Sequence, residues 1–221
     1  MLEKLGNKKL LICFVALAVI VVVGIVALLT INGIPGQDVY SGVDVEKIIQ
    51  LSEYKGITMQ VPEGTTEEVI KRNLLSRVTM DSGIEKYPQR VMKKYIKENT
   101  EYYEGIAKDY GYETLDAYVT EQFQYTLSDF QVYIEEYSKS KAKSEMVVMA
   151  ISKAEGITVT DEEVKAYCDG ILTEEGYTEE TFAQVYGMPM ADYAEEENFE
   201  FQILQDKVLA VLYENATVEY L

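Results

Sequence analysis

A run of 22 residues without a charged side chain, Leu10 to Ile31, constrains this chain more than any other feature. As an α-helix the run would be about 33 Å long, which is enough to cross the hydrocarbon core of a bilayer. A soluble core does not require an apolar stretch of this length. We therefore expect a transmembrane helix over residues 10–31, preceded by a short tail of residues 1–9.

The basic residues around this run predict its orientation. Lys4, Lys8 and Lys9 precede it, and the next basic residue is Lys47. By the positive-inside rule, the tail lies in the cytoplasm and everything after residue 32 is extracytoplasmic. Signal peptides have a shorter apolar region that ends at a small-x-small cleavage site, and this sequence has no such site after the run. We expect an uncleaved, single-pass anchor in the cell membrane.

Composition argues against several classes of function. The chain has 38 acidic and 20 basic residues, and a surface this acidic repels nucleic acid and anionic lipid headgroups. It has no histidine, which removes His-activated nucleophiles and the common zinc sites. The cysteines Cys13 and Cys168 do not form an expected disulfide pair, and no loop has the ligand spacing of a calcium site. We expect no enzyme activity, no cofactor, no metal site and no small-molecule substrate.

Beyond the anchor, hydrophobic periodicity predicts a mainly α-helical protein with a few short strands. Residues 32–42 form a linker marked by Gly and Pro, residues 43–86 form a lead-in segment, and residues 87–221 form a helical domain. The expected elements are a short helix at Val43–Leu51, a strand at Tyr54–Val61, helices at 65–78, 88–109, 114–125, 128–155, 161–175, 178–186 and 190–214, and an extended piece at Ala216–Tyr220.

Capping residues mark where two of these helices begin. Thr65 with Glu68 and Thr160 with Glu163 have the spacing of capping boxes. The long helix ending at Gly156 contains a polar stretch, Ser138–Ser144, which we expect to cross open solvent.

The helical domain shows signs of an internal duplication. Gly111-Tyr112 in the first half matches Gly176-Tyr177 in the second, and each pair follows another glycine at the same six-residue gap. Val147–Ile151 near the end of the first half likewise matches Val208–Leu212. We expect two related units, residues 87–157 and 158–221.

The second unit carries the motifs of a known family. They are Glu155-Gly156-Ile157, the run Thr158 to Glu163, Gly176-Tyr177, Phe182, Tyr186-Gly187-Met188, Asp192-Tyr193, Lys207-Val208-Leu209 and Glu214-Asn215-Ala216. These residues resemble the C-terminal, substrate-holding domain of trigger factor, whose outline is shared with SurA-type periplasmic chaperones. Residues 85–157 resemble the same pattern more loosely. The strand and capped helix of Tyr54–Val78 resemble the segment that runs into the isomerase domain of trigger factor, so the likeness covers about residues 43–221.

The departures from trigger factor shape the expected function. The ribosome-docking stretch of the Gly-Phe-Arg-x-Gly-Lys kind is missing, and the apolar run occupies its expected place. Thr79–Lys86 leaves no room for an isomerase domain, which needs roughly 80–100 residues for its own core. The resemblance therefore implies an ATP-independent holdase that binds unfolded or newly exported polypeptide outside the cytoplasm. The alternatives are a membrane-tethered scaffold for one folded partner, or a relative of peptidyl-prolyl isomerases without the catalytic domain.

Tyrosine and methionine suit adaptable contact with unfolded clients. Our candidates for client binding are Tyr102, Tyr103, Tyr110, Tyr118, Tyr125, Tyr133, Met188 and Met190. Regular apolar spacing favours ordinary core packing for Tyr95, Tyr102 and Tyr103. Four candidates lie near expected loops, and for them core packing and client contact are equally good interpretations: Tyr110, Tyr125, Met188 and Met190.

Overall fold

The structure, a computed structural model, describes residues 39–221. The predicted transmembrane helix at residues 10–31 and the tail before it lie outside the described residues. Among the helices of residues 39–221, none is long and apolar enough to cross a membrane.

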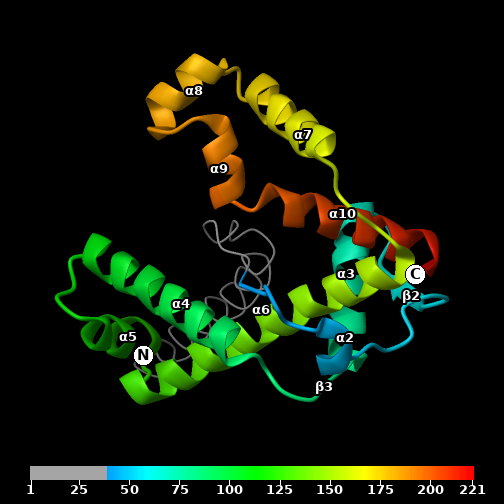
Figure 1. Cartoon of the computed structure of the whole chain (residues 1–221). Helices are drawn as coiled ribbons and strands as arrows, with labels where there is room; N and C mark the ends of the chain where they lie inside the picture. Colours follow the sequence, from blue (N-terminus) through cyan, green and yellow to red (C-terminus); the bar gives the residue numbers. More distant parts are fainter. Residues whose placement is uncertain (1–38) are drawn as a thin grey trace, which may run out of the picture.

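The described chain is mainly helical, with short strands, as the periodicity predicted (Figure 1). Its elements in order are α2 (Val45–Ile48), β1 (Ile49–Gln50), β2 (Thr58–Val61), α3 (Glu67–Asp81), β3 (Gly83–Ile84), α4 (Gln89–Asp109), α5 (Leu115–Phe123), α6 (Leu127–Glu155), α7 (Asp161–Glu174), α8 (Glu179–Tyr186), α9 (Met190–Glu196), α10 (Phe199–Glu214) and β4 (Thr217–Tyr220).

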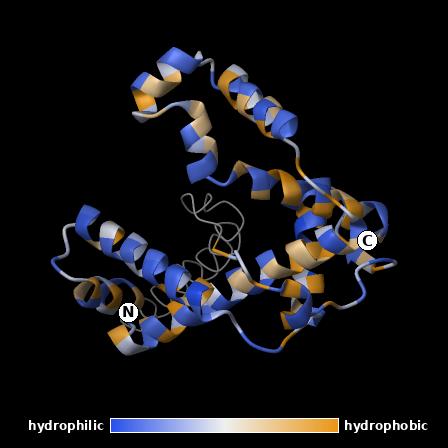
Figure 2. Ribbon diagram, in the orientation of Figure 1, coloured by the Kyte–Doolittle hydropathy of each residue, from blue (hydrophilic) through white to orange (hydrophobic). Residues whose placement is uncertain are grey.

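The body of the molecule is formed where α3, the C-terminal half of α6 and α10 pack together (Figure 1). Hydrophobic residues gather at this junction, while hydrophilic residues dominate the visible surface of α4 (Figure 2). The fully buried side chains include Ile70, Leu74 and Val78 of α3, Met146, Val147 and Ile151 of α6, and Val208 and Leu212 of α10. The apolar ends of α6 and α10, which matched each other in the sequence, therefore share one core.

Two short sheets fasten the ends of the described chain to this body. β2 pairs in parallel with β4, from Thr58 opposite Thr217 to Val61 opposite Tyr220. β1 pairs antiparallel with β3. β2 directly precedes α3 and β4 directly follows α10, so their pairing holds the beginning of α3 near the end of α10.

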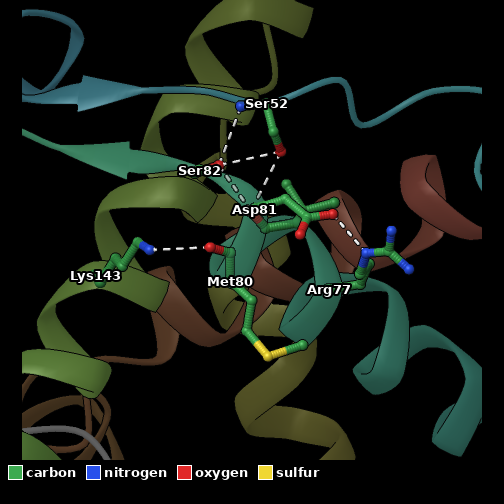
Figure 3. Close-up of polar contacts among 7 residues, drawn as sticks. Ser52, Arg77, Met80, Asp81, Ser82 and Lys143 are labelled. Atoms are coloured by element: carbon green, nitrogen blue, oxygen red, sulfur yellow. Dashed lines mark hydrogen bonds and ion pairs between the residues drawn. The ribbon is translucent and has the colours of Figure 1, made fainter.

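The C-terminal end of α3 is pinned by polar contacts (Figure 3). The hydroxyl of Ser82 donates to the carbonyl of Val78 at 2.7 Å and accepts from the backbone N–H of Ser52 at 3.1 Å. Lys143 of α6 reaches the carbonyl of Met80 at 3.4 Å. Residues 82–88 then lead directly from α3 to the start of α4.

Two arms extend from the body, each with its own small core. Arm 1 consists of α4, α5 and the N-terminal half of α6, and Phe130 and Val119 lie at its centre. Arm 2 consists of α7, α8, α9 and the start of α10, and Phe182 and Phe199 lie at its centre. Figure 1 shows both arms extending to the left of the body, arm 2 above and arm 1 below, with α6 running from arm 1 into the body.

Local signals explain where several helices begin and end. The Thr160 and Glu163 capping box is present at the start of α7, as predicted. Thr126 and Asp129 form a further capping box at the start of α6. Gly156 ends α6 in the left-handed conformation, with φ of 67°, which glycine adopts without steric strain.

Several predicted boundaries were wrong. Thr66, not Thr65, caps α3, because the Thr66 side chain accepts from the backbone of Val69 while Thr65 bonds back to Pro62. The helix expected at 190–214 is two helices, broken at Asn198, whose φ is 53°. The helix expected at Val43–Leu51 is reduced to the single turn of α2, since residues 49–50 join β3. The strand expected at Tyr54–Val61 starts only at Thr58.

The expectation that Ser138–Ser144 crosses open solvent was also wrong. Ser138 and Ala142 are fully buried against α4. The amide of Asn99 donates a hydrogen bond to the Ser138 hydroxyl at 3.0 Å, which satisfies a polar group that would otherwise resist burial. Polarity alone therefore did not predict exposure of this stretch.

Candidate functional site

An open cleft of about 1410 Å³ lies between the body and arm 2. Its walls come from α3, α6, α7, α9 and α10, with Glu179 from the start of α8 and Lys94 and Tyr95 from the first half of α4. The cleft exists because the chain between α6 and α10 leaves the body as a separate arm with its own core.

Apolar side chains are scattered along the cleft instead of forming one continuous patch. Those on the body side are Leu75 and Met80 from α3, Met149 from α6, and Phe201 and Leu204 from α10. Met80 is 67% exposed, which is unusual for a methionine and leaves its thioether side chain available for contact. Thr79 also lines the cleft, and its buried hydroxyl has no hydrogen-bond partner among the described residues.

The arm side of the cleft is acidic. Asp161, Asp169, Glu179 and Glu195 line it, and Lys165 is paired with Asp169 at 2.7 Å. Within residues 39–221, no group of three or more His, Cys, Asp or Glu side chains is arranged to hold a metal ion. These carboxylates give the arm side of the cleft its negative charge.

A polar cluster lines the cleft where α4 and α6 border it. Glu145 of α6 accepts hydrogen bonds from the hydroxyl of Tyr40, at 2.8 Å, and from the hydroxyl of Tyr95. Burial raises the pKa of the Glu145 carboxyl, with Lys141 and the two hydroxyls acting in the opposite direction. Burial also lowers the pKa of Lys141, whose ammonium lies 4.8 Å from the centre of the Tyr95 ring.

This cluster is built to hold elements together. Burial and the neighbouring Glu145 raise the pKa values of both Tyr40 and Tyr95, so neither hydroxyl is activated as a nucleophile or an acid. Instead the Glu145 carboxylate joins α4, α6 and the turn at residue 40. This contact was not predicted from the sequence. The one sequence feature that pointed to it is the position of Glu145, a charged residue directly before the apolar end of a helix.

The tip of arm 1 carries most of the predicted client-binding tyrosines. Tyr110 and Tyr102 are the most exposed of them, at 72% and 54%, and Tyr125 and Tyr133 are also exposed. Tyr103 is half-buried and packs edge-on against Phe130, with ring centres 4.9 Å apart. Tyr118, by contrast, is only 7% exposed and belongs to the core of the arm.

The tip of arm 2 differs from expectation. Met190 is 1% exposed and lies in the core of the arm, while Met188 is half-buried. The exposed apolar residues at this tip are Val185 and Tyr186 of α8, which were not among the predicted client-binding residues. The burial pattern of α8, in which Phe182 alone is fully buried, leaves its other apolar side chains outward.

Both arms turn through the same local geometry. The backbone N–H of Tyr112 bonds to the carbonyl of Ala107, and that of Tyr177 bonds to Leu172, each at 2.8 Å. The preceding glycines, Gly111 and Gly176, have φ values of 82° and 72°. The glycine and tyrosine pairs that matched in the sequence thus make equivalent turns. The unit boundaries at residue 157 stay a prediction.

The fold and the cleft define a class of protein: a helical binding protein in which two arms project from one body and leave an open groove. The model of the family described as bacterial trigger factor protein (TF) C-terminus matches residues 63–214, and the chain belongs to this family. Family membership supports chaperone-like binding of unfolded polypeptide, as the resemblance implied.

A solved structure of domains of trigger factor from Thermotoga maritima is similar in fold, with a TM-score of 0.52 at 18% identity. The similarity covers 76% of this chain and 93% of that chain. Comparison with the curated proteins gave no match. The family and the mainly helical fold are thus confirmed, while neither comparison bears on a membrane anchor.

Proposed function

We propose that this chain is an ATP-independent holdase that binds unfolded or newly exported polypeptide, with its helical domain held outside the cytoplasm by a membrane anchor. The open cleft carries the proposal. At about 1410 Å³ it exceeds the roughly 300–1,000 Å³ typical of small-molecule pockets, and its apolar groups are separated by polar ones. Such a lining favours many weak contacts with a flexible chain over one shaped ligand.

The way a holdase acts fits this surface. Binding to an unfolded form lowers its free concentration, so aggregation slows by mass action without a chemical step. Met80, Phe201 and Leu204 offer adaptable apolar contacts on the body side, and the exposed tyrosines of arm 1 offer aromatic faces with polar edges.

The membrane-anchored part of the proposal depends on the sequence. Its support is the charge-free run at residues 10–31 with Lys4, Lys8 and Lys9 before it. On this basis the tail is cytoplasmic, and the cleft meets polypeptides after their export.

Light scattering of a refolding client in the presence of residues 34–221 tests the holdase activity. We expect suppression of aggregation at a one-to-one ratio without ATP, and an absence of suppression at about tenfold excess would contradict the proposal. A pull-down from cells distinguishes the scaffold alternative, because a holdase returns many unfolded proteins and a scaffold returns one folded partner.

A further inference from the structure

Basic side chains gather on the first half of α4 and just before it, although the protein as a whole is strongly acidic, with a net charge of −18. Residues 86–97 contain five basic residues and no acidic one. The remainder of arm 1, residues 98–137, contains one basic and ten acidic residues, and residues 158–221 contain two and sixteen. Positive charge is thus concentrated at the base of arm 1 and negative charge along both arms.

Helical spacing places the basic residues of α4 together. Arg90, Lys93 and Lys97 follow one another at three- and four-residue steps and lie on the side opposite Val91 and Tyr95, which are buried against α6. We call these three residues, together with Lys86 just before the start of α4, the α4 basic face. Lys86 and Lys93 are exposed, and neither forms an ion pair with another residue of the described part of the chain, whereas Lys97 is paired with Glu101 at 3.7 Å.

The α4 basic face lies beside the point where the described chain begins. The Arg90 guanidinium donates to the carbonyl of Val39, at 3.0 and 2.7 Å, and to that of Ser41, at 2.9 Å. These bonds hold residue 39 against the first turn of α4. The predicted membrane helix ends at Ile31, so the eight residue-to-residue steps from residue 31 to residue 39 can span at most about 29 Å.

Acidic groups near this attachment point are neutralised locally. Asp44 is paired with Lys47 at 2.7 Å, and Glu46 is paired with Lys153. The carboxylates of Asp44 and Glu46 are therefore paired with lysines outside the α4 basic face.

We propose that the α4 basic face docks on the anionic headgroups of the bilayer that carries the anchor, and so turns the acidic arms away from the membrane. The proposal depends on the membrane anchor of the proposed function. At physiological salt the Debye length is about 8 Å, so the charges nearest the bilayer decide the interaction and the net charge of the whole chain does not. Each lysine near an anionic surface favours docking about fivefold, and the same surface repels the arms.

Lysine footprinting of the full chain in vesicles tests this docking. The chain is reconstituted into vesicles of phosphatidylcholine alone or with phosphatidylglycerol, and amine labelling is read by mass spectrometry. In the anionic vesicles we expect labelling of Lys86 and Lys93 to slow at least threefold relative to Lys108 and Lys165. About 0.5 M salt should abolish this difference. Equal labelling in both vesicle types would overturn the docking.

A pair of charge-reversed variants provides a matched control. Lys86→Glu with Lys93→Glu should remove the slower labelling of Lys97 in anionic vesicles. Lys108→Glu with Lys165→Glu changes the net charge equally but lies on the arms, so it should leave Lys97 as slow as in the unaltered chain. Loss of the effect in both variants, or in neither, would contradict a local docking face.

An alkaline carbonate wash separates failure of the docking from failure of the anchor. Retention of the chain in both vesicle types supports the anchor, and the footprint then tests the α4 basic face by itself. Release of the chain by the wash would overturn the anchor and the docking together.

Discussion

The hydroxyl of Tyr40 donates a hydrogen bond of 2.8 Å to the carboxylate of Glu145, a residue 105 positions further along the chain. Tyr95 of α4 donates to the same carboxylate oxygen. One half-buried carboxylate therefore joins the beginning of the described chain, arm 1 and the body. The ionisation of Glu145 should influence how firmly these parts are held.

Glu145 predicts a specific pH dependence of stability. Burial raises its pKa above the ordinary value of 4.5, so the folded protein keeps this proton to a higher pH than the unfolded chain does. The associated stabilisation is fully present below pH 4.5 and is lost as the pH rises through the folded-state pKa. We expect the stability of the unaltered protein relative to Glu145→Gln, measured by urea unfolding of residues 34–221, to fall over this range.

Glu155 provides a control of opposite sign. Hydrogen bonds from Lys55 and Tyr54 lower the pKa of its carboxyl, so its contribution is present above pH 4.5 and is lost as the pH falls through the folded-state pKa. The unaltered protein should therefore lose stability relative to Glu155→Gln on acidification.

The prediction for Glu145 would be contradicted if the free energy of unfolding of the unaltered protein and that of Glu145→Gln changed with pH in parallel. That result would mean that folding does not raise the pKa of Glu145.

Separate cores predict that the arms loosen independently. Phe182 is fully buried in arm 2, and Phe182→Ala should destabilise that arm by about 3–5 kcal/mol, because it removes a ring from a small core. Native-state hydrogen exchange should accelerate across residues 161–196 and remain unchanged in α3. Phe130→Ala should likewise destabilise arm 1, with faster hydrogen exchange in that arm and unchanged exchange in α3. Uniform acceleration throughout the chain would contradict independent cores.

Two glycines in different conformations predict opposite effects of the same substitution. Gly156→Ala should destabilise the protein by about 1–2 kcal/mol, because Gly156 has φ of 67° and alanine is strained there. Gly105→Ala, within α4 and with no atom in its way, should stabilise it by about 0.5–1 kcal/mol. Thermal denaturation of both variants measures the difference, and shifts of the same sign would refute this account.

Tyr102 and Tyr220 are both 54% exposed, but Tyr102 lies on arm 1 and Tyr220 lies in β4 of the body. If the arm contacts clients, Tyr102→Ser should weaken the binding of an unfolded polypeptide about three- to tenfold, as expected for loss of an aromatic contact. Tyr220→Ser should leave it unchanged. Fluorescence anisotropy with a labelled, permanently unfolded client measures both, and equal affinities would remove Tyr102 from the client surface.

The parts of this fold that could be predicted from the sequence depend on residues close together in the chain. The capping box of Thr160 and Glu163, the end of α6 at Gly156 and the extent of α4 follow from interactions within one or two helical turns. The family followed from the same motifs, because their order along the chain is preserved.

Tertiary structure alone decided which candidate side chains face outward. Tyr110 and Tyr118 lie in the same arm, yet one is 72% exposed and the other 7%, because α6 supplies Phe130 and Ile134 to the arm core on only one side. Ser138 is buried because Asn99 lies across from it on α4. The sequence by itself determined the helices and the family; packing between segments far apart in the chain decided the cleft, since burial of a side chain depends on which distant residues meet it.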